Sequence, residues 1–474
     1  MYKYNFIYEL KTLLRNGWIQ VLSLLLLVLF GFAAFNGSKK VEKRKLDIST
    51  IQEEVKESDK KMLVLLDSIE QGFEVNASPW TIPSRPTAVG NYHPRVAAMP
   101  PSALAFIASG QSDLFTHYVK PTMAGDDFAL NFTEISSPVQ QLFGSFDLSF
   151  VIIYLLPLII IAFSYNVLSA ERESGSLKLL ASQPISIPMW VLQKIIIRFF
   201  WITLLTLILL TSAFIIFSES VDLGNMLSFI GLTVAYISFW FALAFVVNLR
   251  AGNSAKNAIT ILGLWLVFVL LAPSIVNQLG STLYPMPSRT LMINKMRVVK
   301  AEATKKQDEI LDNFLRDHPE YAINDPSQSR RFYHRYMASQ ELVKKELEPV
   351  VSEFEQQLHK QQTWVGTLKW ISPSIIMQQA LNQISGSSTK NYENYRGQVI
   401  QFAETWRQHL IPFLYNNQPF TSNDYKDLPS FEYEPLTSKN TAILASAILL
   451  ISVIIIILGI VFSPKTKSAK TLLF

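Results

Sequence analysis

Apolar residues in this chain gather in six long segments. They lie at residues 17–36, 148–169, 195–217, 226–247, 258–276 and 441–462. Each is close to the ~20 residues that an α-helix needs to cross a hydrocarbon core ~30 Å thick. No Asp or Glu occurs inside any of them, as expected because a charge at mid-membrane costs about 2.5–3.5 kcal/mol or more. The pattern predicts an all-α polytopic membrane protein with six transmembrane helices. It argues against the alternative of core helices in a soluble protein.

Basic residues in the short connections predict the orientation of these helices. With a cytoplasmic N-terminus, 12 Lys and Arg residues lie on the cytoplasmic side, in or next to residues 1–16, 170–194, 248–257 and 463–474. The short connection 218–225 on the opposite side has no basic residue but contains Glu219 and Asp222. Because basic residues concentrate on the cytoplasmic side of membrane proteins, we expect both termini in the cytoplasm. The long connections 37–147 and 277–440 are then extracytoplasmic.

The N-terminal residues 1–16 have the pattern of an amphipathic helix. Phe6, Leu10, Leu13 and Leu14 recur at helical spacing, and basic residues occupy other positions. Such helices lie in the membrane interface, so we expect an elbow helix on the cytoplasmic face that leads into the first span. The alternative is a cleaved signal peptide. It is disfavoured because the first apolar segment exceeds the usual apolar region of about 7–15 residues.

The two long connections differ in pattern from the spans. Residues 37–72 repeat apolar positions at near-helical intervals among many charges, which predicts that the first helix continues beyond the membrane. Residues 75–101 are rich in proline and read as a loop. The second connection predicts helices at 288–315, 327–347, 350–371 and 391–410, separated by prolines that include Pro349. We expect one mostly helical domain built from both insertions, packed against each other and a partner.

Composition supports the membrane assignment and excludes several classes of protein. Hydrophobic residues make up 49% of the chain and charged residues only 17%, against roughly 25% charged residues in soluble domains. The net charge of +5 over 474 residues is small, so no nucleic-acid partner is predicted. The chain has no cysteine. Disulfides, thiolate metal ligands and a cysteine nucleophile are therefore excluded, and the redox compartment stays open.

Catalytic and cofactor motifs do not occur in the sequence. There is no G-x-x-x-x-G-K-[ST] loop, no H-E-x-x-H and no G-x-S-x-G, and the six histidines are scattered outside the spans. We therefore predict no catalytic residue, metal site or cofactor on this chain, which is not expected to be an enzyme. The spans also have no acidic residue of the kind that relays protons or binds cations in ion-coupled transporters. Any energy for transport would come from elsewhere.

Three smaller features allow two interpretations each. The run from Arg330 to Tyr336 around His334 is basic and aromatic; it could contact an anionic ligand or lipid headgroups, but an exposed helix face is favoured. Asp126 and Asp127 could act as paired carboxylates, although a turn is favoured. Pro157 and Pro273 lie inside the second and fifth spans, and we expect helix kinks there.

The connection 170–194 contains the most informative motif. Charged residues leave the second span, Gly175 allows a turn, Leu177, Leu179 and Leu180 form a short apolar patch, and Pro184 ends it. A short helix parallel to the membrane with an exposed apolar patch would suit a groove on a soluble partner. An ordinary interfacial loop is the alternative, and the physical argument alone leaves the two equally open.

This loop resembles a known signature. Glu171-Arg172-Glu173-x-Gly175-Ser176-Leu177, followed by Leu180-x-Ser182-x-Pro184, is similar to the E-[RK]-E-x-G-[TS]-L…[ST]-x-P pattern of permease subunits of type-2 ATP-binding-cassette exporters. The resemblance extends to the six spans, the elbow helix and the position of the loop. It implies a coupling helix that contacts a separate ATPase subunit, formed by Glu171, Arg172, Glu173, Gly175, Ser176, Leu177, Leu180, Ser182 and Pro184.

The same resemblance implies the partners. ATP and Mg²⁺ would bind the ATPase subunit, and a second permease subunit would complete a homo- or heterodimer whose pathway is lined by spans one, two and five. Two large insertions depart from the common pattern. Tyr284-Pro285-x-Pro287-Ser288 and Ser372-Pro373-x-x-x-x-Gln378-x-Ala380-Leu381 resemble an uncharacterised bacterial subfamily that has both insertions.

Taken together, these features lead to an expected function. We expect a multi-pass protein of the bacterial cytoplasmic (inner) membrane, surrounded by membrane lipid, that exports a lipid-like, amphipathic or peptide substrate. ATP hydrolysis on a separate subunit, docked at residues 171–184, would drive the export. The alternative is a membrane-anchored envelope assembly or sensor protein. Such a protein would bind an envelope partner through its outer helical domain.

Overall fold

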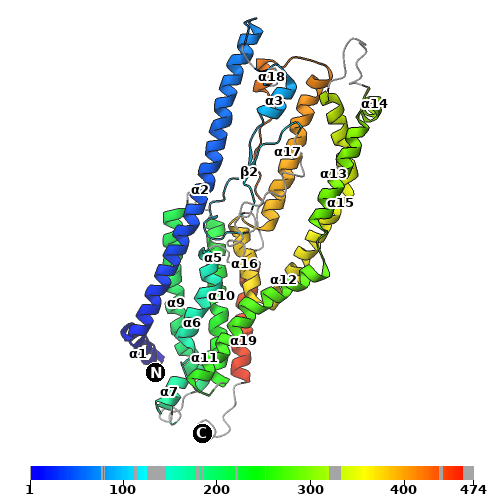
Figure 1. Ribbon diagram of the computed structural model, residues 1–474. Coiled ribbons are helices and arrows are strands. Elements are labelled where there is room, and N and C mark those ends of the chain that lie inside the picture. The colour runs from blue at the N-terminus through cyan, green and yellow to red at the C-terminus, as the bar shows by residue number, and fades with distance from the viewer. Residues whose placement is uncertain are drawn as a thin grey trace.

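The protein is an elongated, mostly helical molecule (Figure 1). The computed structural model describes residues 2–75, 78, 81–110, 113, 115–124, 146–177, 182, 186–218, 223–250, 252–319, 332–436 and 441–462. A bundle of long helices forms one half of the molecule, and a second helical region is stacked on one of its ends. We call that second region, the described parts of residues 37–124 and 284–436, the distal domain. The opposite end of the bundle, where α1 (Tyr2–Arg15) lies, is called the terminal end.

Six helices in the described part of the chain are long and apolar enough to cross a membrane. They are α2 (Gly17–Glu70), the continuous run of α5 (Leu148–Phe150), η3 (Val151–Leu155), α6 (Leu156–Ser164) and α7 (Ser169–Glu173), α9 (Ile187–Phe217), α10 (Leu223–Arg250), the run of α11 (Ser254–Trp265), η4 (Leu266–Leu271) and α12 (Ala272–Leu283), and α19 (Thr441–Val461). The number of candidate spans in the described residues equals the predicted number, and the chain has the character of a multi-pass membrane protein. The third helix begins at Ile187, earlier than the apolar segment at 195.

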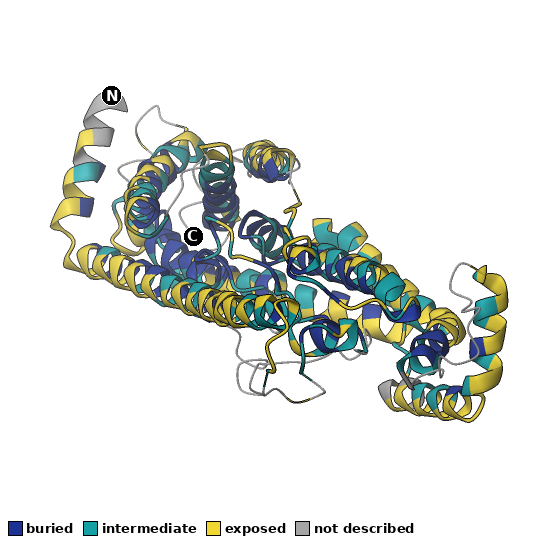
Figure 2. Ribbon diagram, turned by 90° about the horizontal axis from the view of Figure 1, so that it is seen from above, coloured by how far each residue is buried: buried dark blue, intermediate teal, exposed yellow. Residues whose placement is uncertain are grey.

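The core of the bundle is built around α10. Its large side chains Phe229, Tyr236, Trp240 and Phe245 are almost completely buried, and α10 packs against α19, α9 and α6. The opposite sides of α2, α9 and α11–α12 expose many large apolar residues, and the exposed side of α2 is visible along its length in Figure 2. Such exposure suits helices that are surrounded by lipid rather than by water.

Two helices depart from α geometry at the predicted prolines. A π-helical turn, η3, precedes Pro157, and a second, η4, precedes Pro273. Proline has no N–H, and a π-helical turn also shifts the hydrogen-bond pattern, so carbonyl groups are released at both places. In the second span, Tyr236 Oη donates to the Ile153 carbonyl at 3.0 Å and Trp265 Nε1 to the Tyr154 carbonyl at 3.2 Å.

The distal domain begins as a direct extension of the first span. Helix α2 runs without interruption to Glu70, so the predicted continuation beyond the apolar segment is confirmed. A short helix, α3 (Pro86–Tyr92), follows α2. Two antiparallel strands come next, with Ala97 opposite Val119. Sequence patterns did not predict these strands. The strands are β1 (Ala97–Ala98) and β2 (Tyr118–Val119).

The second insertion supplies the remaining helices. They are α13 (Arg289–Lys305), α14 (Gln307–Asp317), α15 (Phe332–Leu368), η6 (Lys369–Ile371), α16 (Pro373–Ile384), α17 (Thr389–Tyr415) and α18 (Ser422–Lys426). The predicted break at Pro349 is wrong, because α15 continues through this residue. Prediction also missed α16 entirely.

The two insertions form one domain by packing against each other. Tyr395 Oη donates to the Ala97 carbonyl at 2.9 Å, and Trp406 Nε1 donates to the Gly90 carbonyl at 3.2 Å. The first of these bonds joins α17 to a strand of the first insertion, and the second joins α17 to α3. Both donors are buried, so the distal domain has apolar cores of its own.

Helix α16 belongs to the membrane bundle rather than to the distal domain core. Its residues Ile376, Met377, Ala380 and Leu381 are buried in the same apolar cluster as the spans. It packs against α10, α19 and η4. At its start, Ser374 Oγ donates at 2.8 Å to the Phe268 carbonyl of η4, and Ser372 Oγ donates to the same carbonyl. The distal domain is therefore tied to the irregular turn in the fifth span.

Candidate partner-docking site

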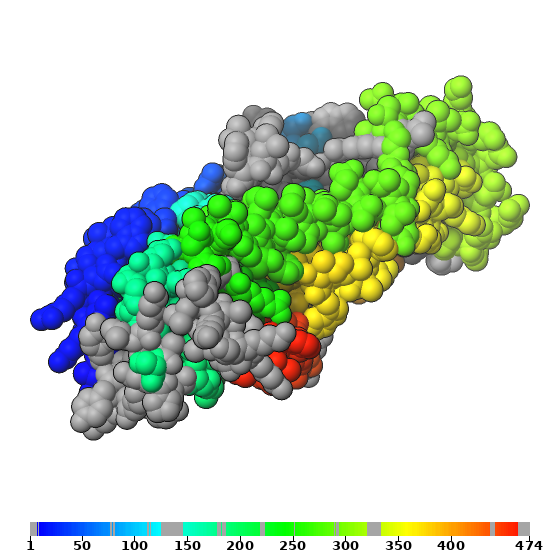
Figure 3. Space-filling view, turned by 90° about the horizontal axis from the view of Figure 1, so that it is seen from below, coloured from blue at the N-terminus to red at the C-terminus, as the bar shows by residue number. Residues whose placement is uncertain are grey.

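The motif of the connection 170–194 lies at the terminal end of the bundle, between α6 and α9. Helix α7 is only five residues long and ends at Glu173. Gly175 follows with φ +79°, which an L residue rarely adopts, so the predicted turn at this glycine is confirmed. In the view from below, segments of α1, of the region between α6 and α9, and of α11 contribute to this face (Figure 3).

Glu171 is held by side chains of its own chain. Its Oε1 accepts a hydrogen bond from Lys194 Nζ at 2.8 Å, and its Oε2 accepts one from the Ser176 hydroxyl. The first bond connects α7 to the start of α9, and the second closes the turn at Gly175. The Glu171 side chain is 26% exposed. Its carboxylate therefore orders the loop and does not project from it.

Glu173 and Arg172 join the loop to the connection between α10 and α11. Glu173 Oε1 accepts from the backbone N–H of Ser254 at 2.7 Å, and Glu173 Oε2 accepts from the Ser254 hydroxyl at 2.9 Å. Ser254 is the first residue of α11, so Glu173 caps one backbone N–H group at a helix start, where a negative charge is favourable. Arg172 Nη1 donates to the Gly252 carbonyl at 2.6 Å.

A buried charge network lies beneath the loop. It consists of Glu9 on α1, Glu171, and Lys194 and Arg198 on α9. Glu9 Oε2 is 3.4 Å from Lys194 Nζ, and Glu9 Oε1 is 3.1 Å from Arg198 Nη2. The Glu9 side chain is only 2% exposed, and burial makes such a charge costly unless it is paired. The network therefore ties α1, α7 and α9 into one unit.

Two buried asparagines satisfy the backbone where α6 ends and α7 begins. Asn248 Nδ2 donates to the Ser164 carbonyl at 2.7 Å, and Asn248 Oδ1 accepts from the Leu168 N–H at 3.2 Å. Asn257 Nδ2 donates to the Tyr165 carbonyl at 2.8 Å. Both side chains are completely buried. Sequence reasoning missed Glu9, Asn248 and Asn257 as parts of this site. The available signals were two asparagines next to the ends of apolar segments and a single acidic residue, Glu9, in the segment 1–16.

The predicted site residues divide into exposed and inward groups. Glu173, Gly175 and Ser182 are exposed, and Ser176 is half-buried. Leu177 is 4% exposed and packs into the bundle core, so the prediction that it forms an exposed apolar patch is wrong. The turn at Gly175 directs it inward, where its burial is favourable. Leu179, Leu180 and Pro184 lie outside the described residues.

Other candidates from the sequence do not gather at a site. His334 is buried, with Nε2 3.1 Å from the Leu414 carbonyl and its ring against Tyr415. The favoured exposed helix face is therefore wrong at this residue, which is a core histidine. Asp126, Asp127, Arg330 and Arg331 lie outside the described residues. Within the described part of the chain, no three His, Cys, Asp or Glu side chains gather in a way that could hold a metal.

Comparison with known proteins adds one match. Residues 289–434 match the sequence model of a family described as a domain of unknown function (DUF3526). The match covers the second insertion from the start of α13 to beyond α18, which is less than half of the chain. No curated protein matches the sequence. The match assigns no activity, and it does not include the loop between α6 and α9.

Proposed function

We propose that this chain is the permease subunit of an ATP-binding-cassette exporter, driven by a separate ATPase subunit that docks at the terminal end. The observation that carries the proposal is the connection of the loop to three helices. Glu171 binds Lys194 on α9, Glu173 caps α11, and Lys194 also contacts Glu9 on α1. A loop held in this way would move with those helices, whereas an untethered loop would absorb a push from a partner.

The resemblance of the loop to the exporter signature supports the same proposal. The contacts of the loop also connect, through α11, to residues beyond the loop. Helix α11 continues through η4, whose Phe268 carbonyl accepts hydrogen bonds from Ser372 and Ser374 at the start of α16. Displacement of α11 would therefore act on the contact between the fifth span and the distal domain.

Sidedness and partners form part of the proposal. The terminal end would face the cytoplasm and the distal domain the outside of a bacterial inner membrane, as the basic residues of the short connections indicate. Glu173, Gly175 and Ser182 would offer the exposed surface to the ATPase, which binds ATP and Mg²⁺. A second permease subunit would complete the transporter. The absence of acidic residues from the spans favours a lipid-like, amphipathic or peptide cargo over a small ion.

Recruitment of an ATPase tests the proposal directly. The full chain is co-expressed with the P-loop ATPase subunits of its host, and the proteins that co-purify with it are identified. Gly175→Pro is expected to reduce ATPase recruitment at least about tenfold, because φ +79° is forbidden to proline. Glu432→Ala, an exposed substitution in the distal domain, serves as the control. Absence of any P-loop subunit from the wild-type preparation, or equal recruitment by Gly175→Pro, would contradict the proposal.

A second candidate is an envelope assembly or sensor protein that acts through the distal domain. It is favoured by one observation: the family match covers only that domain, which has its own apolar cores. In that case the spans serve as anchors. The Gly175→Pro variant then keeps the activity of the wild-type chain, and neither protein recruits an ATPase. The recruitment experiment therefore separates the two candidates.

A further inference from the structure

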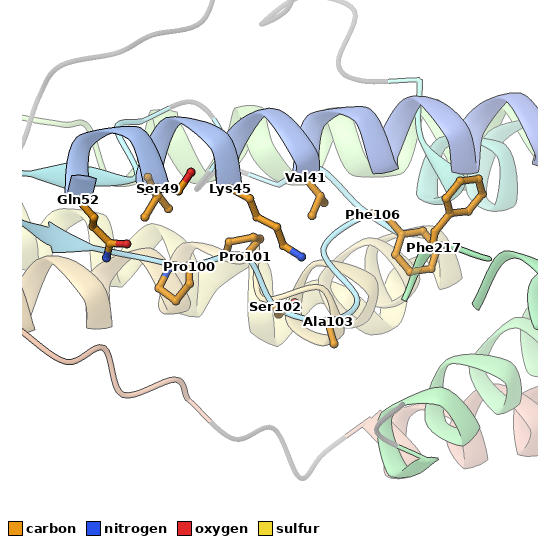
Figure 4. A pocket seen from close by; sticks show the side chains of 11 residues that line it. Val41, Lys45, Ser49, Gln52, Pro100, Pro101, Ser102, Ala103, Phe106 and Phe217 are labelled. Atoms are coloured by element: carbon orange, nitrogen blue, oxygen red, sulfur yellow. The ribbon is translucent and has the colours of Figure 1, made fainter. Parts of the chain in front are cut away.

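A cleft lies where the α2 extension passes the first insertion (Figure 4). It has a volume of about 320 Å³. One wall is α2, from Val41 to Gln52, and the other is the segment Pro100–Ala103, with Phe106 and Phe217 at one end. Phe217 is the last residue of α9, one of the six candidate spans. The cleft is therefore placed at the boundary between the membrane bundle and the distal domain.

The lining is apolar near the bundle and mixed farther along α2, where Ile48 lies between Lys45 and Ser49. Near the bundle, Phe106 and Phe217 lie with their ring centroids 6.2 Å apart. Farther from the bundle, Ser49 and Gln52 line the α2 wall. Lys45 lies between these ends and extends across the cleft toward the segment Pro100–Ala103. None of the described residues that line the cleft is acidic.

The charge of the cleft comes from a basic stretch of α2. Residues 39–45 contain five basic residues, but not all of them face the cleft. Arg44 is turned into the distal domain, where its Nη2 donates to the Met99 carbonyl at 2.7 Å. Lys40 Nζ contacts the Ser109 hydroxyl at 3.3 Å, and Lys39 pairs with Glu42. Lys45 is the basic residue that lines the cleft among the described residues.

We propose that this cleft binds the anionic headgroup and the first chain carbons of an acidic phospholipid from the membrane leaflet beside the distal domain. The order of the lining matches such a molecule: its apolar part would lie against Phe106 and Phe217, and its phosphate would face Lys45. Ligand pockets that enclose a drug-sized molecule measure about 300–1,000 Å³. The cleft lies at the lower end of that range, so it holds the headgroup region while the acyl chains stay in the membrane.

The site goes beyond the proposed transport function and does not depend on it. The site is formed by side chains of this chain, and the proposed lipid binding involves neither ATP nor a partner subunit. The test therefore uses the purified full chain alone. A failure of lipid binding leaves the ATPase recruitment experiment unaffected, and the reverse also holds.

Photocrosslinking in lipid nanodiscs tests the site. The chain is reconstituted with a phosphatidylglycerol whose chain carries a diazirine near the headgroup, or with the matching phosphatidylcholine, and the crosslinked peptides are identified by mass spectrometry. We expect the acidic lipid to crosslink within residues 41–52 and 100–106. Lys45→Glu should reduce this labelling about tenfold, because it replaces the cation that would face the phosphate with a carboxylate. Lys43→Glu, at an exposed position outside the cleft, should leave it unchanged.

A second variant, a folding control and a competition experiment separate the possible explanations of the labelling. Ala103→Trp retains Lys45 but fills the cleft, and it should also abolish labelling, which tests the cavity separately from the charge. Melting temperatures of all variants identify any that fail to fold. Equal labelling by the two lipids would overturn the proposal, as would labelling unaffected by both Lys45→Glu and Ala103→Trp. Inorganic phosphate at millimolar concentration should not compete; full competition would assign the cleft to free anions and overturn the lipid site.

Discussion

Replacement of Lys194 by methionine is the sharpest test of the charge network. Lys194 Nζ lies 2.8 Å from Glu171 Oε1 and 3.4 Å from Glu9 Oε2, and its side chain is 8% exposed. Methionine keeps the apolar stem and removes the charge, so both carboxylates lose a cation. Removing one partner of a buried ion pair costs about 3–5 kcal/mol. We expect about 2–3 kcal/mol here, because Arg198 still pairs with Glu9 and Glu171 is partly exposed.

The assay is equilibrium unfolding of the full chain in detergent, followed by circular dichroism. Glu9→Gln and the double variant complete a thermodynamic cycle, and the double variant should be more stable than the sum of the single effects predicts by at least about 1 kcal/mol. Lys256→Met, at an exposed position, is the matched control and should change stability by less than about 0.5 kcal/mol. A cost for Lys194→Met as small as that of the control, or additive effects in the cycle, would refute the role of the network.

Three further predictions concern released carbonyls and a buried histidine. Tyr236→Phe removes the donor to the Ile153 carbonyl and should cost about 1–3 kcal/mol; Pro157→Ala in that background should recover part of the loss, because the N–H of residue 157 is restored. Ser372→Ala combined with Ser374→Ala should cost more in the same unfolding assay than the sum of the two single variants, because either hydroxyl alone still serves the Phe268 carbonyl. Burial, reinforced by the Arg44 charge, lowers the pKa of His117 to about 3. Stability should therefore fall as the pH drops from about 6.5 toward 3, by up to about 1.4 kcal/mol per pH unit from this group, and His117→Gln should flatten the profile.

The sign of the His117 effect follows from proton binding. Between the two pKa values the unfolded chain holds a proton on this imidazole that the folded chain does not, so acid favours unfolding. Asp113 acts in the opposite direction, because burial raises its pKa and its folded form retains a proton above the usual range. Comparing His117→Gln with the wild-type chain isolates the histidine contribution. Parallel stability profiles of the two proteins between pH 6.5 and 4 would show that His117 is not buried in its neutral form.

Helix α16 illustrates why part of the fold escaped prediction. Its sequence is short and only moderately apolar, and it begins at the pair Ser372-Pro373, which reads as a helix break. Its burial depends on α10, α19 and η4, which surround it. Tertiary packing also explains why α15 continues through Pro349. A proline ends an isolated helix, but tertiary packing on both sides of it offsets the lost hydrogen bond.

The loop between α6 and α9 shows a similar division. Its turn at Gly175 was predictable because only glycine tolerates the required backbone angle at no steric cost. The direction of Leu177 was not, since a three-residue apolar patch has no periodicity that distinguishes an exposed face from a buried one. The partners of Glu171 and Glu173 come from α9 and α11, which are distant in sequence.

The sequence by itself determined the six spans, their polar connections and the continuation of the first helix, because these depend on local hydrophobicity and helical periodicity. The count of basic residues in the short connections also predicts which face of the membrane these connections occupy, and this orientation stays a prediction. Only the tertiary structure decided that Glu9, Lys194 and Glu171 meet, that α16 enters the bundle, and that Lys45 lies across a cleft beside Phe217. Each of these depends on contacts between segments far apart in the chain, and local patterns carry no information about such pairings.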